Sequence, residues 1–158
     1  MRTLRGVTYA ADEARQELLD AVAGATNRLA VGLAALGDAY EQLDETSADK
    51  LEEDLFRPVQ VAYGRLRKTH SDFADRHRMP RRSFLPAGSR AASHGVKGFL
   101  ESAVEAVTEA DEEIAALQDS LKPVEVGDPD LRAGLAEVRR LLADVERASR
   151  RFVSGYGR

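Results

Sequence analysis

The histidines and carboxylates are the first residues to consider for metal chemistry. His70 and His77 are seven residues apart, two turns along one helical face, which places their Cα atoms roughly 10 Å apart. That is too far for both to bind one metal ion. No glutamate is followed at the third position by a histidine, the pattern that di-iron helical proteins use. With no cysteine in the chain, thiolate zinc sites, iron–sulfur clusters and disulfides are excluded. We expect no metal site and no cofactor, and interpret both histidines as partly buried groups near a helix end.

Nucleophilic and carboxylate catalysis have no clear candidates either. The chain contains no Gly-x-Ser-x-Gly elbow and no Gly-rich phosphate loop followed by Lys-Ser/Thr. Carboxylates occur in runs, at 52–54 and 111–113, but adjacent residues of a helix point about 100° apart. Such runs are typical of solvated helix faces. We expect a protein without enzymatic activity.

The strongest chemical signal is a basic segment that mixes cations with apolar side chains. Residues 78–90 read Arg-Met-Pro-Arg-Arg-Ser-Phe-Leu-Pro-Ala-Gly-Ser-Arg, and the prolines and glycine predict a loop. Arginine and aromatic side chains carry much of the binding energy at protein interfaces. The predicted binding residues for an anionic partner are Arg78, Arg81, Arg82, Phe84 and Arg90. A plainer alternative is that Phe84 and Leu85 cover the open end of a helical core.

Four segments with helical periodicity must position this loop, at about residues 9–45, 47–77, 92–121 and 129–155. In each of them apolar residues recur at steps of three and four, the period of one helical face. Pro58 lies inside the second segment and predicts a kink there. Asp128 followed by Pro129 predicts the start of the last helix. No segment alternates for long enough to make a half-buried strand.

These segments predict an all-α fold in one domain spanning residues 1–158. Because the connections look short, we expect an antiparallel up-down-up-down four-helix bundle with long helices of about 27–34 residues. A second arrangement also fits, in which two long helical hairpins complete their core only in a dimer. The heptad spacing, which is typical of coiled coils, fits both.

Charge is unevenly distributed along a chain whose net charge is -4. Residues 1–20, 65–98 and 144–158 together carry 16 basic and 8 acidic side chains, and the remainder carries 7 and 19. In an up-down-up-down bundle the three basic segments share one end, so the sequence predicts a rod with a basic and an acidic end. A purely solvated surface pattern is the alternative. A glutamate stripe at 101, 105, 109 and 113 would then be neutralised by arginines of the last helix, such as Arg132, Arg139 and Arg140.

We therefore expect a non-enzymatic interaction module whose basic end, loop 78–90, docks an anionic partner. One alternative is a small-ligand-binding or catalytic bundle with a cavity near Pro58, Tyr63 and the glycines of the first helix. Another is a self-assembling structural protein. The expected partner is a protein or a second copy, with an anionic ligand as a further option. The isoelectric point near 5.5 argues against nucleic acid as the main partner.

Location is predicted only by default. No apolar run reaches about 18 residues, the length that crosses a membrane, and one short loop would bind a membrane surface weakly. The first six residues lack the apolar stretch of a secretory signal. We expect a cytoplasmic protein. Frequent alanine and arginine with only four lysines suggest a GC-rich bacterial genome.

Overall fold

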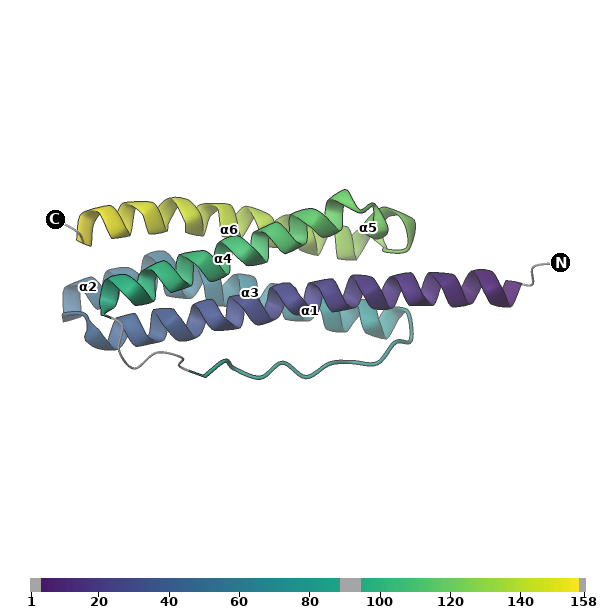
Figure 1. The fold of residues 1–158 in the computed structure, drawn as a ribbon, viewed down its shortest axis with the longest axis horizontal. Helices are drawn as coiled ribbons and strands as arrows, with labels where there is room; N and C mark the ends of the chain where they lie inside the picture. Colours follow the sequence, from purple (N-terminus) through teal and green to yellow (C-terminus); the bar gives the residue numbers. More distant parts are fainter. Residues whose placement is uncertain (1–3, 89–94, 157–158) are drawn as a thin grey trace.

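The computed structural model describes residues 4–88 and 95–156, and all regular structure in these ranges is helical. Figure 1 shows long helices lying side by side along one axis. The all-α prediction is confirmed. In chain order the elements are α1 (Leu4–Gln42), α2 (Glu45–Leu51), the π-helical η1 (Glu52–Phe56), α3 (Arg57–Arg76), α4 (Val96–Asp119), α5 (Lys122–Glu125) and α6 (Pro129–Tyr156).

The helix starts follow from side chains that accept backbone hydrogen bonds. Asp44 begins α2 by accepting a hydrogen bond from the Ser47 N–H, and Asp128 begins α6 by accepting one from the Leu131 N–H. Pro129 then occupies the first position of α6, as predicted. The observed helix ends differ from the predicted ones by a few residues, and the predicted start of the third segment, at residue 92, lies outside the described residues.

The region around Pro58 is helical throughout. The elements α2, η1 and α3 form one continuous helix from Glu45 to Arg76, and the Arg57 N–H bonds the carbonyl of Glu52, five residues back. In a regular α-helix the Pro58 ring would clash with the carbonyl of Asp54. The predicted irregularity is present as a wider π-helical turn that contains Asp54.

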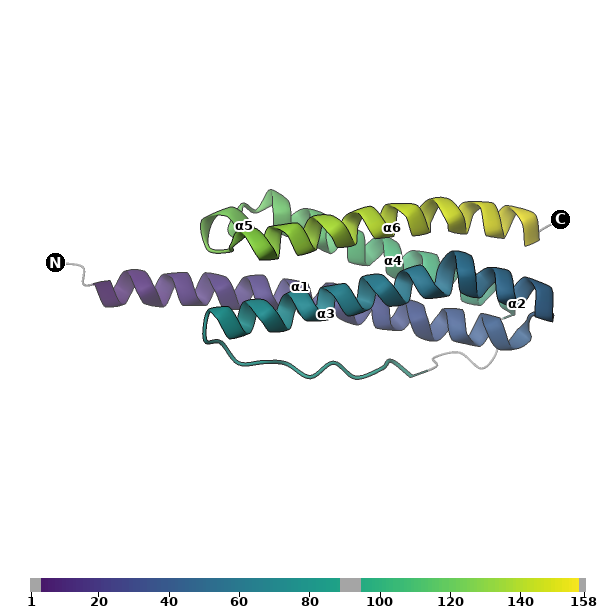
Figure 2. The same cartoon turned by 180° about the vertical axis from the view of Figure 1, so that it is seen from behind.

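The connection between α3 and α4 gives the molecule its topology. Figures 1 and 2 show the described part of this connection, residues 77–88, returning along α3; α3 and α4 run in the same direction, and α1 and α6 run opposite to both. In the described chain α1 contacts α3 and α4, and α6 contacts the same two helices. The predicted up-down-up-down order is therefore wrong. An extended chain spans about 3.3 Å per residue against 1.5 Å in a helix, so a connection of this length can pass along a 20-residue helix.

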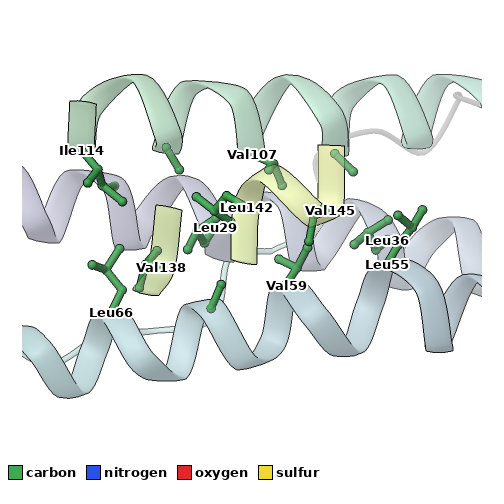
Figure 3. Packing of buried hydrophobic residues seen from close by; sticks show 14 of the residues in the cluster. Leu29, Leu36, Leu55, Val59, Leu66, Val107, Ile114, Val138, Leu142 and Val145 are labelled. Carbon is green, nitrogen blue, oxygen red and sulfur yellow. The ribbon is translucent and has the colours of Figure 1, made fainter. Parts of the chain in front are cut away.

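One continuous apolar cluster joins the long helices. Figure 3 shows Leu29 of α1, Leu66 of α3, Ile114 of α4 and Leu142 of α6 pointing into the same interior. Side chains of this size contribute roughly 1.5–3 kcal/mol each when fully buried. The predicted apolar stripes therefore form the core, although the helices that carry them are connected differently.

The corrected topology removes the predicted basic end. The N-terminal part of α4 and the C-terminal part of α6 lie opposite to the end where α3 finishes. The predicted basic segment 65–98 is therefore divided between the two ends, because α3 finishes at one end and α4 begins at the other. Among the described residues no helix is long and apolar enough to cross a membrane.

Candidate functional site

The predicted basic loop is an extended segment on the side of the molecule. We call its residues Met79–Gly88 the strap. It begins just after α3, where Arg78 has a positive φ of 56° and the Met79 N–H bonds the Ala74 carbonyl at 2.8 Å. This is the geometry of a Schellman turn, in which a left-handed residue ends a helix. The turn sends the strap back along α3 and α1.

Arg81 ties the first residues of the strap to α3. Its guanidinium donates two hydrogen bonds to the carboxylate of Asp75, with Nε 2.8 Å from Oδ1. These bonds lower the pKa of Asp75, and burial opposes them. Both side chains are exposed, and exposed ion pairs contribute little to stability. Arg81 is thus used in an intramolecular contact that holds the strap weakly.

Phe84 holds the middle of the strap against α3. Its ring meets the ring of His70 edge to face, with centroids 5.2 Å apart. His70 is only 2% exposed, and its Nδ1 has no hydrogen-bond partner among the described residues. Burial lowers the pKa of His70, the positive charge of Arg82 lowers it further, and Asp20 of α1 opposes them. His70 is therefore neutral at pH 7, and Arg82 lies close enough to affect its charge.

A groove of about 380 Å³ lies between α1, α3 and the strap, which we call the basic groove. Its polar groups come from α3, where the Arg67 guanidinium lies over the Tyr63 ring, 5.4 Å from the ring centroid. The remaining surface is mostly apolar. The lining residues are Ala30, Leu33, Ala34, Gln60, Tyr63, Arg67, Phe84, Pro86 and Ala87.

Arg67 of the groove, Arg78 of the turn and Arg82 of the strap have no carboxylate partner among the described residues. In the part of the chain that the structure describes, no acidic oxygen lies within 4 Å of the side-chain nitrogens of Arg67, Arg78 or Arg82. The Arg67 guanidinium lies over the π face of Tyr63, and all three side chains are exposed. The face formed by α3 and the strap therefore carries positive charge that no ion pair neutralises.

A second groove, of about 250 Å³, lies on the other side of α1 and has the opposite charge. We call it the acidic groove. It lies between α1 and α4, reaches the end of the strap at Gly88, and includes Asp38, Glu105 and Glu109. Ala34 lines both grooves. The outer surface of α1 thus has a cationic side towards α3 and an anionic side towards α4.

Arg28 of α1 pairs with two glutamates of the predicted stripe. Its guanidinium lies 3.2 Å from Glu109 and 3.8 Å from Glu113. Burial raises the pKa of Glu113, Arg28 opposes this and Glu109 adds to it. The alternative in which arginines of the last helix neutralise this stripe is wrong for Arg139, which bonds Asp111 and Gln118.

A third charged cluster joins α3 to the start of α6. Arg76 donates two hydrogen bonds to Asp128, and His77 Nε2 lies 2.9 Å from the same carboxylate. Burial opposes the ionisation of Asp128, but the hydrogen bonds from Arg76, the Leu131 N–H and His77 outweigh it and lower its pKa to about 2. Since Asp128 also caps α6, this cluster has a structural role.

The structure brings together only part of the predicted binding set. Phe84 lines the basic groove, Arg82 lies close enough to His70 to affect its pKa, Arg81 is paired with Asp75, and Arg78 lies at the turn before the strap. Arg90 lies outside the described residues. The alternative in which Phe84 and Leu85 cover the end of the core is wrong: Phe84 packs on His70, and Leu85 is 79% exposed.

Sequence reasoning missed Arg67 as a member of the site. Tyr63 and Arg67 are four residues apart, which places them on one face of α3. That spacing next to a basic loop was the available signal. The groove itself depends on the path of the strap, which the sequence pattern does not give.

The described residues contain no group of three His, Cys, Asp or Glu side chains placed to hold a metal ion. Comparison with protein families, curated proteins and solved structures gave no match. The argument for function therefore rests on the geometry of this chain.

Proposed function

We propose that this chain is a non-enzymatic interaction module, a single four-helix bundle that docks an anionic protein partner on the strap and the basic groove. The observation that carries the proposal is the unneutralised charge of Arg67, which lines an apolar groove, and of Arg82, two residues before Phe84 of the same groove. Elsewhere, arginines such as Arg65 and Arg76 are committed to carboxylates of α6 and its cap. Positive charge left without a partner beside an apolar surface favours binding of an acidic surface.

The apolar lining of the groove favours a partner segment that carries apolar side chains between its acidic residues. Leu33 and Phe84 line it, and the nearby Leu85 is largely exposed on the strap. An acidic segment that also carries an aromatic or aliphatic side chain could place that side chain in the groove and its carboxylates against the two arginines. Charge-assisted hydrogen bonds of this kind are about twice as strong as neutral ones.

The test uses a fluorescein-labelled peptide of glutamates with two interspersed phenylalanines, and a control peptide in which lysine replaces every glutamate. Fluorescence anisotropy should show binding of the acidic peptide only, weakening as salt is raised. The double variant Arg67→Glu/Arg82→Glu should weaken binding at least about tenfold. The matched control is Arg150→Glu, an exposed cation of α6 far along the chain from the strap. Equal loss in both variants would refute the proposal.

A small-ligand module is the second candidate, and the volume of the basic groove favours it. About 380 Å³ falls within the range of small-molecule sites, and Tyr63 was among the residues predicted to line a cavity. The ligand class that fits is an aryl or alkyl carboxylate. In a thermal-shift assay, phenylbutyrate should raise the melting temperature of the wild type and not of Arg67→Glu. Phenylbutylamine is the matched control ligand.

A further inference from the structure

Part of α4 carries negative charge that the chain itself does not neutralise. Glu101, Glu105 and Glu109 lie four residues apart and form what we call the acidic row. Like charges at this spacing repel each other mildly. Glu109 pairs with Arg28, but in the described ranges no cation lies within 4 Å of Glu101 or Glu105, and both are exposed.

The acidic row and the basic groove lie on two sides of the same helix, at the same height, because Ala34 of α1 lines the grooves on both sides. Arg67 lines the groove towards α3, and Glu105 and Glu109 line the groove towards α4. Among the described residues no ion pair joins Arg67 or Arg82 to Glu101 or Glu105, so these charges do not pair directly within one chain.

We infer that the partner of the basic groove is the acidic row of a second copy of this chain, in a two-fold symmetric dimer. This inference rests on the proposed function, because it assigns a partner to the same basic surface. A two-fold axis that passes midway between two complementary patches matches each patch with the other patch of the second copy. Both contacts therefore form at once, and α1 lies at the centre of the interface.

The two-fold arrangement limits the number of chains in the assembly, whereas end-to-end attraction does not. Each chain uses both of its charged surfaces in one closed pair, so association stops at the dimer. End-to-end attraction would leave one basic and one acidic surface open and would continue into filaments. The unbalanced charges flank α1 on the side of the molecule, which favours the closed pair.

The experiment measures molar mass by size-exclusion chromatography with light scattering, at 100 µM protein in about 50 mM and 500 mM salt. The wild type should be a dimer at low salt and should shift to monomer at high salt, because exposed charge attraction is screened. Arg67→Glu/Arg82→Glu and Glu101→Arg/Glu105→Arg should each be monomeric at low salt. Circular dichroism checks that both variants keep the helical content of the wild type.

Mixing the two variants is the decisive step. A chain with a reversed basic surface and a chain with a reversed acidic row are complementary at both contacts, so an equimolar mixture should regain the dimer. The paired control reversals Arg150→Glu and Glu125→Arg lie outside both surfaces and should remain dimeric. A monomeric wild type at low salt, a dimer that ignores salt, or a mixture that stays monomeric would each overturn the inference.

The outcome separates this inference from the proposed function. The variant Glu101→Arg/Glu105→Arg keeps the basic groove, so it should bind the acidic peptide at least as tightly as the wild type. A monomeric wild type that still binds the peptide would overturn the dimer and leave the proposed function standing. If Arg67→Glu/Arg82→Glu bound the peptide as well as the wild type, the proposed function would fail as well.

Discussion

The contact between α3 and α6 and the contact between α3 and the strap differ in how they use charge. Across α3 and α6, Arg65 lies 2.7 Å from Glu137, and Arg76 and His77 bind Asp128. Among the described residues the strap has one ion pair, between Arg81 and Asp75, which are six residues apart and exposed. Charge that holds helices together is not available to a partner. The difference supports our proposal that the strap side binds a partner, whereas the charges between α3 and α6 hold the helices together.

The glycines give the same contrast in packing. A Cβ built at Gly134 of α6 would lie 2.3 Å from Oγ1 and 3.2 Å from Cβ of Thr69, whereas at Gly88 and at Gly64 nothing lies within 4 Å. Thr69 is itself held by a 2.8 Å hydrogen bond to the Arg65 carbonyl. The α3–α6 contact therefore has no room for a side chain, and the strap side has room.

The largest expected effect comes from filling that close contact. Gly134→Val should lower the free energy of unfolding by about 2–3 kcal/mol, because the branched side chain must displace Thr69 or separate the helices. Urea unfolding followed by circular dichroism measures the change. The control is Gly64→Ala, at an exposed position of α3. It should raise the free energy of unfolding by up to about 1 kcal/mol through helix propensity. Equal effects at the two positions would contradict the contrast.

Removal of the Asp128 carboxylate should have the next largest effect. Asp128→Ala removes the cap of α6 and the acceptor for Arg76 and His77, at a cost of about 2 kcal/mol. The matched change Asp75→Ala removes the acceptor for Arg81 and should leave the urea midpoint unchanged. A comparable loss in both would mean that the strap is held as firmly as α6.

Acid unfolding should distinguish the same two regions. The pKa of Asp128 is lowered from 3.8 to about 2 in the folded chain. A carboxyl group whose pKa falls on folding stabilises the folded state at pH values above its unfolded pKa. This stabilisation is lost as the pH falls through the folded pKa. Between pH 4 and pH 2 the wild type should therefore lose more stability than Asp128→Asn. Parallel pH profiles for the two proteins would contradict this role of Asp128.

The smallest effect on global stability should come from the strap. Phe84→Ala removes the contact with His70 and should speed trypsin cleavage after Arg81 and Arg82 several-fold, since cleavage follows local opening. The melting temperature should change by only a few degrees. Cleavage at the wild-type rate would show that Phe84 does not hold the strap, and a large loss of stability would show that the strap belongs to the core.

The periodic stripes predicted the helices and the core because burial of one helical face demands a 3.6-residue period. Leu29, Leu66, Ile114 and Leu142, which all lie on predicted stripes, are buried together. The direction of each helix was not predictable in this way. It depends on residues 77–95, and a connection containing Pro80, Pro86 and Gly88 can turn at once or run the length of a helix with the same composition.

The candidate site was predictable where it depends on local sequence. Arg82 and Phe84 belong to the predicted loop, and the Arg81–Asp75 pair is separated by only six residues. The prediction of a basic end was wrong, because the helical period contains no information about which helix ends meet. Arg67 joins the site through the path of the strap, and the burial of His70 depends on α1 and the strap together.

The most direct test of the account is hydrogen exchange of the wild type with and without the acidic phenylalanine-containing peptide. The account predicts slower exchange in residues 60–67 and 79–88 when the peptide is bound, with residues 140–156 of α6 unchanged. Protection confined to α6, or equal protection along all helices, would contradict the assignment of the strap face as the binding surface.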